Sequence, residues 1–283
     1  TTQIAKNTKT HMNFFKKNLV KIFINRNKPR YSRLLFLFCS KYIDFCYGDN
    51  AFDRETNGEY WLLGRLQGKM KVVFDVGANV GDYSKKILSS NPDVVVHAFE
   101  PDVRAFDQLQ ANTKDFKKRI ILNNCAVGEK KAQMQLFRHS KTVFNSLFDI
   151  HEQDKKEKAL MVQVTTLDEY VKDHNIRHVD FLKVDVEGYE FFVLKGAENM
   201  FKQGIVDMVQ YEFSGATLES RFFLRDFLRF FESYGYDMYR LKCRSLERVE
   251  YFPDQERFTL TNFVAVKRGL QIDHIPQTIP FYH

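Results

Sequence analysis

Long apolar runs and paired cysteines are both missing from this sequence. No stretch reaches the about 18 consecutive apolar residues that a membrane-spanning helix needs. The four cysteines, Cys39, Cys46, Cys125 and Cys243, lie far apart and form no C-x-x-C pair. These absences argue against a spanning helix, a zinc site and a disulfide framework, and they predict a reducing, cytoplasmic compartment.

Acidic residues are scarce at the start of the chain. Residues 1–47 hold ten lysines and arginines against one acid, Asp44, which gives this segment a net charge of +9. Because the whole chain carries +7, the other 236 residues carry −2. The body therefore lacks the positive surface that binding to phosphates requires.

The basic segment also contains large apolar residues. Residues 12–47, broken by Pro29, suit one or two amphipathic helices. Three interpretations stay open: a helical cap on the main domain, a surface that contacts the anionic inner membrane or a lipid-linked substrate, and a nucleic-acid-binding arm. His11-Met12 resembles a cloning junction, so residues 1–11 receive no role. The expected division is a tail at 1–11, a basic helical segment at 12–68, a main domain at 69–268 and a tail at 269–283.

Residues 71–84 have the pattern of a strand, a tight turn and a helix. A short apolar run is followed by Gly77, Asn79 and Gly81, which tolerate the positive φ of a turn and let the backbone approach a ligand. The start of the next helix presents free N–H groups. A second strand ends at Glu100, where an acid is placed to bind ribose hydroxyls. The stretch predicts a nucleotide-type cradle.

Strand and helix patterns alternate through the rest of the chain. The polar residues 138–160 form the longest loop, a candidate lid that carries His139 and His151. The alternation predicts an α/β fold with a mostly parallel, doubly wound sheet and an antiparallel edge. Further strands are expected at 94–99, 120–124, 181–184, 205–211 and 236–241, long helices at 190–203 and 218–234, and a last hairpin between 246–249 and 262–266.

The turn itself distinguishes between two ligands. The pattern Asp75-x-Gly77-x-Asn79-x-Gly81 has asparagine where a dinucleotide turn has its second glycine, and Asp75 adds a negative charge. A ligand with an ammonium group and no phosphate suits this turn. S-adenosylmethionine is therefore favoured over a dinucleotide.

Several motifs occur in the order that one family has, and together they resemble the FkbM-type S-adenosylmethionine-dependent methyltransferases over about residues 59–266. A stretch near residue 210 also resembles the bacterial branch found among surface-polysaccharide genes. The motifs are Asp75-Val-Gly-Ala-Asn-Val-Gly81, Phe99-Glu-Pro101, Asn123-Asn-Cys-Ala-Val-Gly128, Asn145-Ser-Leu147, Thr166-Leu-Asp-Glu-Tyr170, Phe181-Leu-Lys-Val-Asp-Val-Glu-Gly-Tyr-Glu190 and, for the branch, Val209-Gln-Tyr-Glu-Phe213 with Ser220-Arg-Phe-Phe223.

The resemblance implies the class I methyltransferase, Rossmann-like sheet, with strand order 3-2-1-4-5-7-6 and strand seven antiparallel. It also implies O-methylation of a hydroxyl, often on a sugar, here of a surface polysaccharide or its precursor. The donor contacts that it implies are Asp75, Gly77, Ala78, Asn79 and Gly81 around the methionine part, Glu100 and Pro101 at the ribose, Asn124, Cys125 and Ala126 at the adenine, and Asp185 at the amino group or the acceptor.

A sugar hydroxyl is a poor nucleophile while it is protonated, so its methylation needs a base or a metal. Acidic residues follow the fourth and fifth strands of the sheet, at the edge where ligands bind. We expect Glu187 to be the general base, with Asp185 as the next choice and Glu212 as a group that orients the acceptor. Lys183 is expected to pair with a carboxylate or to contact the acceptor, and Glu190 to be a helix N-terminal charge.

Other chemistries fit the sequence less well. Asp185, Glu187 and Glu212 could supply oxygen ligands to a divalent metal, but no Asp-Asp or Asp-Asn pair follows the fourth strand, so a metal is not favoured. The alternative function is an RNA or other nucleic-acid methyltransferase that uses the basic segment. The negative body and the absence of an Asn/Asp-Pro-Pro-aromatic turn argue against it. The acceptor sugar and the oligomeric state stay open.

Overall fold

A computed structural model describes residues 29–49, 53–138, 145–149 and 159–278. The chain divides into two compact units, Thr1–Tyr47 and Gly48–His283. The described part of the first unit is one helix, α2 (Pro29–Tyr47), which begins at a proline as helices often do. Residues 48–68 belong to the second unit with the sheet. Predictions that fall on residues 1–28, including the first part of the basic segment, lie outside the described residues.

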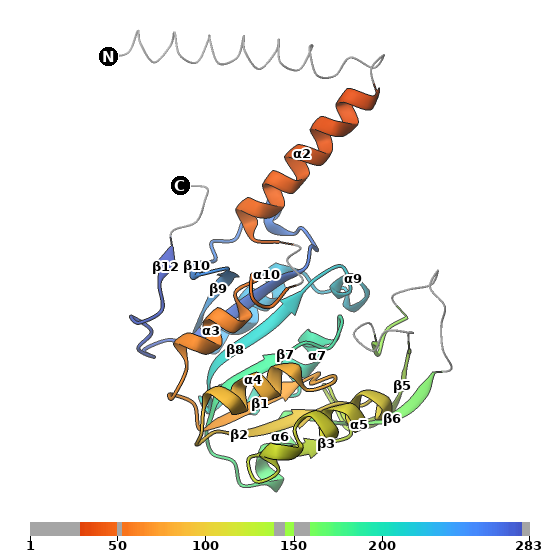
Figure 1. Cartoon of the computed structure of the whole chain (residues 1–283), viewed down its shortest axis with the longest axis vertical. Helices are drawn as coiled ribbons and strands as arrows, with labels where there is room; N and C mark the ends of the chain where they lie inside the picture. Colours follow the sequence, from red (N-terminus) through yellow and green to blue (C-terminus); the bar gives the residue numbers. More distant parts are fainter. Residues whose placement is uncertain (1–28, 50–52, 139–144, 150–158, 279–283) are drawn as a thin grey trace. The chain divides into compact units, whose positions relative to one another are not determined.

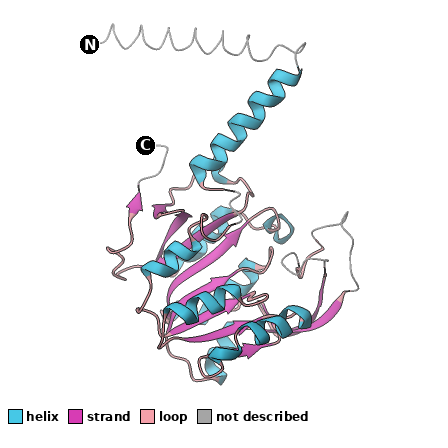
Figure 2. Ribbon diagram, viewed as in Figure 1, coloured by secondary structure: helices cyan, strands magenta, loops and turns pink. Residues whose placement is uncertain are grey.

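The second unit is a sheet with helices on both faces (Figures 1 and 2). Its helices are α3 (Glu59–Arg65), α4 (Asp82–Ser90), α5 (Val103–Asn112), α6 (Leu167–Asp173), α7 (Glu190–Lys195), α8 (Glu198–Lys202), α9 (Thr217–Ser220) and α10 (Leu224–Ser233), with short 3-10 turns at Lys114–Phe116 and Pro253–Gln255. Its strands are β1 (Val72–Val76), β2 (Val95–Phe99), β3 (Ile120–Asn123), β4 (Ala126–Val127), β5 (Ala132–Leu136), β6 (Leu160–Thr165), β7 (Val179–Val184), β8 (Val206–Phe213), β9 (Tyr236–Lys242), β10 (Ser245–Arg248), β11 (Thr261–Lys267) and β12 (Gln277–Thr278).

The large sheet has the order β12-β10-β9-β11-β8-β7-β1-β2-β3. From β3 to β8 neighbouring strands are parallel, and β11 is antiparallel to both β8 and β9. Counting only its seven core strands, this is the order 3-2-1-4-5-7-6 with the seventh strand antiparallel, which confirms the predicted fold. The strands β4, β6 and β5 form a separate small sheet.

Three details of the predicted element list are wrong. The last hairpin joins β9 to β10, whereas β11 inserts between β9 and β8. The expected helix at 218–234 is two helices, because Arg221 between α9 and α10 has a left-handed φ of 61°. The expected helix at 190–203 also divides, at Gly196, where an added Cβ would lie 1.9 Å from the Gly128 carbonyl oxygen.

Alternate strand residues pack against opposite helical layers, as a doubly wound sheet requires. On β1, Val73 packs with α3, α4 and α5 residues such as Ile87, whereas Phe74 packs with the layer of α6, α7, α8 and α10. Near the carboxyl ends of the strands, the layer under α3 and α4 changes from apolar to polar. The residues Asp75, Lys183 and Gln210 there follow Val73, Phe181 and Met208 by two positions. This change places charged groups next to the ligand-binding edge.

Candidate active site

One cavity of about 650 Å³ opens at the carboxyl ends of the central strands. This volume lies within the range of about 300–1,000 Å³ that small-molecule sites have. Two parts of its lining, here called walls, differ in composition. The turn wall consists of Val76, Gly77, Asn79, Phe99, Glu100, Pro101, Cys125, Ala126 and Val127, and the carboxylate wall of Asp185, Glu187 and Glu212.

The turn between β1 and α4 has the expected backbone. Gly77, Asn79 and Gly81 have φ angles of 83°, 48° and 89°. However, the structure shows that glycine is required at Gly77 and Gly81 by contacts within the protein, not by the approach of a ligand. A Cβ on Gly77 would lie 1.8 Å from the Asp185 carbonyl oxygen, and one on Gly81 would lie 2.5 Å from Leu109 Cδ1. The glycines therefore let the turn pack against the β7 end and against α5, and only Gly77 of the two lines the cavity.

Glu100 fixes this turn from the end of β2. Its Oε2 accepts the Asn79 N–H at 2.8 Å, and its Oε1 accepts the Asp102 N–H at 2.8 Å. Burial raises the pKa of Glu100 to about 7, although the two backbone hydrogen bonds lower it. Each oxygen keeps a lone pair that could accept from a ligand hydroxyl. A carboxyl held in this position at the strand end suits the recognition of a diol.

Asp75 does not line the cavity. Its side chain is fully buried beneath the turn, where Oδ2 accepts from the Ser84 hydroxyl at 2.6 Å and Oδ1 has no hydrogen-bond partner among the described residues. Burial raises the pKa of Asp75, and the nearby Lys183 ammonium opposes this shift. The side chain can therefore act on a ligand only through its neighbours.

Lys183 pairs with a carboxylate, one of its two expected roles. Its side chain is 2% exposed, and its ammonium donates to Asp185 Oδ2 at 2.7 Å and lies 4.8 Å from the centre of the Tyr83 ring. It is absent from the cavity lining. Burial alone would raise the pKa of Asp185, but the Lys183 ammonium holds this pKa below its usual value.

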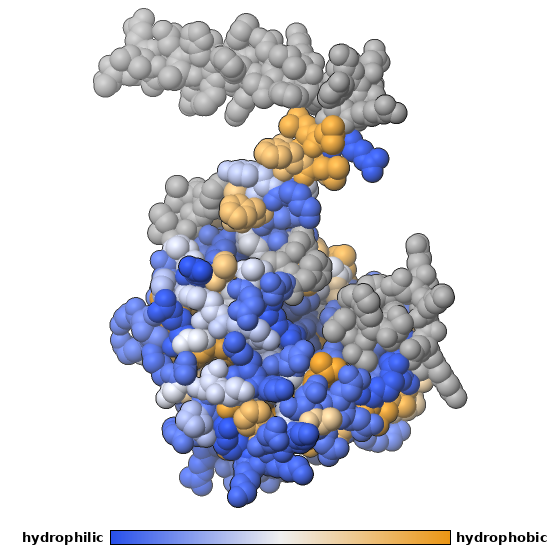
Figure 3. Space-filling view, in the orientation of Figure 1, coloured by the Kyte–Doolittle hydropathy of each residue, from blue (hydrophilic) through white to orange (hydrophobic). Residues whose placement is uncertain are grey.

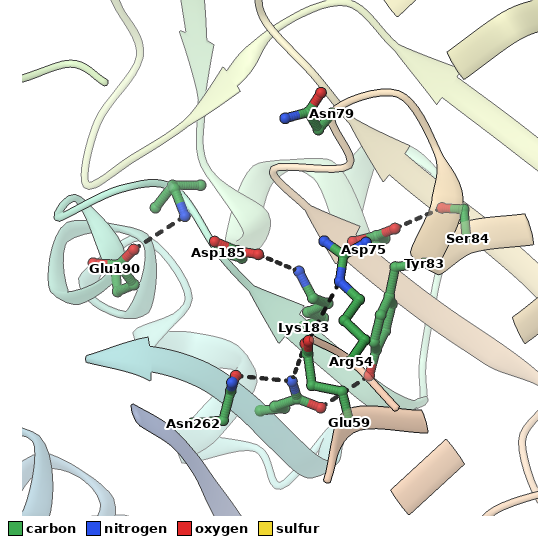
Figure 4. Close-up of polar contacts among 12 residues, drawn as sticks. Arg54, Glu59, Asp75, Asn79, Tyr83, Ser84, Lys183, Asp185, Glu190 and Asn262 are labelled. Carbon is green, nitrogen blue, oxygen red and sulfur yellow. Dashed lines mark hydrogen bonds and ion pairs between the residues drawn. The ribbon is translucent and has the colours of Figure 1, made fainter. Parts of the chain in front are cut away.

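A buried polar network that the sequence did not reveal supports both walls (Figure 4). Glu59 of α3 accepts from Asn57 Nδ2 at 3.0 Å and from Gln210 Nε2 at 2.8 Å. Gln210 also donates to Asn262 at 3.0 Å and accepts from the Tyr83 hydroxyl at 2.9 Å. In the sequence, this network is indicated only by an acid at the start of a helix, Glu59, and by amide side chains within apolar strands, Gln210 and Asn262. The network joins α3, α4, β8 and β11 beneath the cavity.

Arg54 extends from this network to the cavity. Its Nε lies 3.3 Å from Glu59 Oε2, and Figure 4 shows its guanidinium reaching toward Asp75. Arg54, Asn57 and Glu59 all line the cavity, although the sequence pattern had assigned none of them.

The carboxylate wall brings together the three acids that the sequence singled out. Oxygen atoms of Asp185, Glu187 and Glu212 lie within 4.8 Å of one another. Burial raises the pKa of Glu187, and the charges of Asp185 and Glu190 raise it further. Burial and the same neighbouring carboxylates raise the pKa of Glu212. Like charges this close disfavour ionisation of all three groups, so the wall favours the uptake of a proton or a cation.

Glu190 lies behind this wall and does not line the cavity. Its Oε1 accepts the N–H groups of Val186 and Gly188 at 3.0 and 3.1 Å. It therefore closes the turn that carries Glu187, whose φ of 53° is left-handed. This is a local structural role at the start of α7, close to the helix-terminal role that was expected.

The remaining predicted contacts divide into lining and supporting residues. Cys125 and Ala126 line the cavity, whereas Asn124 does not and instead donates to the carbonyl oxygens of Glu100 and Pro101 at 2.9 and 3.3 Å. Ala78 is buried away from the cavity. The donor contacts stay predictions, now narrowed to the residues that reach the cavity.

The described part of the candidate lid also lines the cavity. Asn145 donates to Asp102 Oδ2 at 2.7 Å, and the Ser146 hydroxyl donates to the Glu187 carbonyl oxygen at 2.6 Å. This segment therefore connects the end of β2 with the turn that carries Glu187. His139 and His151 lie outside the described residues.

A divalent metal stays a prediction that is not favoured. The three oxygens of the carboxylate wall are close enough to bind one ion. The described residues offer one other such group, His178, Asp180 and Asp207, in which the imidazole lies between the two aspartates. This group lies at the amino-terminal ends of β7 and β8, away from the cavity.

Known proteins resemble this chain over its central part. The Methyltransferase FkbM domain model matches residues 75–238, more than half of the chain. The 31-O-demethyl-FK506 methyltransferase FkbM of Streptomyces tacrolimicus is 26% identical over 155 residues, which cover 45% of this chain and 60% of that protein. The hexuronic acid methyltransferase AglP of Haloferax volcanii is 27% identical over 161 residues, with coverages of 52% and 64%. The matches thus span about three fifths of these relatives.

Solved structures are similar at a lower level. A precorrin-6y C5,15-methyltransferase from Geobacter metallireducens aligns with a TM-score of 0.42 and 12% identity over 74% of this chain and 87% of that one. TYW2 of M. jannaschii, in complex with AdoMet, aligns with a TM-score of 0.37 and 14% identity over 76% of each chain. At these scores the fold rests on the strand order given above. By its family match, the chain belongs to the FkbM methyltransferase domain family, within the S-adenosylmethionine-dependent methyltransferases.

Proposed function

We propose that the protein transfers a methyl group from S-adenosylmethionine to a hydroxyl of a sugar or glycan, such as a surface polysaccharide or its precursor. The observation that carries the proposal is the carboxylate wall. Asp185, Glu187 and Glu212 lie together in the same cavity as the turn wall, so a base and a donor site share one space. A hydroxyl acceptor is the class of nucleophile that needs such a base.

The turn wall fits the donor by its chemistry. Glu100 offers two preorganised acceptor oxygens for the ribose hydroxyls, and Cys125, Ala126 and Val127 offer an apolar surface for the adenine ring. Bound S-adenosylmethionine supplies a methyl group activated by a sulfonium. The protein's part is to hold the acceptor oxygen in line with that group and to exclude water.

Glu187 is our first choice for the general base. Lys183 keeps the pKa of Asp185 low, which makes Asp185 a weak base that stays ionised. Burial and the neighbouring charges raise the pKa of Glu187 and of Glu212, so these two groups hold a proton more strongly. Glu187 takes the proton from the acceptor, and Glu212 orients the acceptor oxygen.

The two relatives support a hydroxyl or sugar acceptor without identifying it. AglP is named for a hexuronic acid, and FkbM for the 31-O-demethyl form of FK506. With the reducing compartment expected from four free cysteines, we place the reaction in the cytoplasm.

Transfer of a labelled methyl group tests the proposal. The chain is incubated with methyl-labelled S-adenosylmethionine and a panel of hexoses, uronic acids, bacterial glycans and RNA oligomers. We expect label on a hydroxyl of a glycan and a loss of about 10²–10⁴-fold in kcat for Glu187→Gln. Glu129→Gln, at an exposed carboxylate that pairs with Lys195, is the matched control. Label on RNA alone, or full activity of both Glu187→Gln and Glu212→Gln, would overturn the proposal.

We also propose that the N-terminal unit contacts an anionic membrane surface. Helix α2 exposes an apolar surface that Figure 3 shows in orange, and no described helix is long and apolar enough to cross a membrane. Residues 1–47 add a charge of +9, which favours anionic lipid. The exposed apolar residues of α2, with 39–83% exposure, are Leu34, Phe36, Leu37, Phe38, Tyr42, Ile43 and Phe45.

Vesicle co-sedimentation tests the membrane contact. The whole chain should sediment with vesicles that contain phosphatidylglycerol and not with neutral vesicles, and the double variant Phe38→Asp, Phe45→Asp should stay in solution. Met161→Asp, at an exposed methionine on β6, is the control for a general effect of lost surface hydrophobicity. Equal sedimentation of the wild type and the double variant would contradict the proposal.

A further inference from the structure

The charges that line the cavity are strongly one-sided. Among the described lining residues, Arg54 is the one cation, against six carboxylates. S-adenosylmethionine carries two positive groups, a sulfonium and an ammonium, and one carboxylate. The acids suit the positive groups, but they repel the carboxylate, which needs a separate partner. The lining carboxylates are Glu59, Glu100, Asp185, Glu187, Glu212 and Glu219.

We propose that Arg54 binds the carboxylate of the donor's methionine part. This inference rests on the proposed use of S-adenosylmethionine, and it assigns a binding residue that lies before the family match at residues 75–238. A guanidinium suits the task because it can donate two parallel N–H bonds to one carboxylate.

The position of Arg54 fits this role. Its side chain is 32% exposed, and its one ion pair with a described residue uses Nε, 3.3 Å from Glu59 Oε2. The guanidinium carbon lies 6.0 Å from the centre of the Tyr83 ring, and the group reaches toward Asp75, beneath the turn (Figure 4). No hydrogen bond or ion pair to another described residue uses its Nη groups, and Arg54 lines the cavity, so a ligand there can meet them.

The other nearby cation is already engaged. Lys183 lies behind the cavity surface, with 2% exposure, and is held by Asp185 at 2.7 Å. A ligand carboxylate could reach it only by breaking a buried ion pair, which is costly. Arg54 is therefore the cation that a ligand can meet.

Arg54 is also held in place before any ligand binds. Glu59, its partner, is fixed by Asn57 at 3.0 Å and by Gln210 at 2.8 Å. Such preorganisation reduces the entropy that binding must cost. The segment before β1 therefore takes part in donor binding and does more than cover the sheet.

A comparison of two donors tests the assignment. Decarboxylated S-adenosylmethionine keeps the adenosine, sulfonium and amine and lacks only the carboxylate. Calorimetry on the whole chain should show that the wild type prefers S-adenosylmethionine by about 10- to 100-fold, the contribution of hydrogen bonds between charged groups. Arg54→Gln should lose that preference by weakening only S-adenosylmethionine. Arg54→Lys, which keeps the charge but not the fork of donors, should lose part of it.

Several outcomes would overturn the inference. If Arg54→Gln weakens both donors equally, Arg54 only supports the network around Glu59. If it changes neither, the carboxylate is held elsewhere, for instance by the N–H groups at the start of α4. Arg65→Gln, which removes a guanidinium lying 5.7 Å from the centre of the Trp61 ring, should leave both affinities unchanged. If the wild type binds neither donor, the proposed function fails instead, which the comparison distinguishes.

Discussion

Replacement of Gly77 by alanine tests how the cavity is built. The added Cβ would lie 1.8 Å from the Asp185 carbonyl oxygen, whereas a carbon and an oxygen ordinarily stay about 3.3 Å apart. The turn and the end of β7 must therefore separate by about 1.5 Å, the difference between these distances. Both segments line the cavity, so the change alters its shape as well as its stability.

The expected magnitude has two parts. Gly77 has a φ of 83°, and an alanine in this left-handed region costs about 1–2 kcal/mol. Overpacking against a rigid carbonyl adds about 1–3 kcal/mol. Gly235 isolates the first part, because its φ is 80° and an added Cβ there meets no atom within 4 Å.

Urea unfolding followed by circular dichroism measures both variants. Gly235→Ala should lose about 1–2 kcal/mol of unfolding free energy, and Gly77→Ala about 2–5 kcal/mol together with its affinity for S-adenosylmethionine. Equal losses in the two variants would refute the argument that Gly77 serves close packing of two backbones.

Other predictions concern buried charges. Asp49→Ala removes the carboxylate that Arg240 contacts at 2.7 Å, where the arginine side chain is 4% exposed, and should cost about 3–5 kcal/mol in urea unfolding; a loss below about 1 kcal/mol would contradict this. Lys183→Met removes the cation beside Asp185 and should also lower the unfolding free energy by about 3–5 kcal/mol. Adding Asp185→Asn should restore part of this stability; no restoration would mean that the two residues are not coupled. Burial raises the pKa of Glu190 from 4.5 to about 7, so its contribution to stability is present below pH 4.5 and is lost as the pH rises through about 7. As the pH rises from 4.5 to about 7, the unfolding free energy of Glu190→Gln should increase by up to about 3 kcal/mol relative to that of the wild type. Parallel curves of unfolding free energy against pH for the two proteins would exclude the effect.

The doubly wound, mostly parallel sheet could be predicted because short apolar strands and polar helices alternate along most of the chain, whereas the order of its strands was implied only by the family resemblance. The carboxyl ends of three strands could also be predicted, since the acids Glu100, Asp185 and Glu212 interrupt apolar runs. The break after α9 could not be predicted, because Arg221 is neither glycine nor proline and its left-handed φ depends on packing.

The supporting network was hidden for a similar reason. Gln210 and Asn262 sit in strands that otherwise read as core, and Glu59 follows a turn far away in the sequence. Their meaning depends on side-chain hydrogen bonds across 52 to 151 residues, which no local pattern specifies. The same holds for the role that we propose for Arg54, which follows only from the acids that line the cavity with it.

The roles of the glycines show the limit of motif reasoning. The pattern at Gly77 and Gly81 correctly predicts a turn with positive φ. It does not say which neighbour approaches, and the structure shows protein atoms at both positions. A pattern that suits ligand contact can thus serve packing first.

Binding of S-adenosylmethionine to the whole chain tests the central claim most directly, namely that the turn wall is a donor site. Calorimetry should show one site per chain with a Kd of about 1 µM–1 mM, the range in which the KM values of enzymes typically lie. Glu100→Ala, which removes both acceptors that fix the turn and that we propose to bind the ribose, should weaken binding at least about 10-fold. Glu129→Ala, at an exposed carboxylate outside the cavity, should bind as the wild type does. No binding to the wild type, or unchanged binding by Glu100→Ala, would contradict the account.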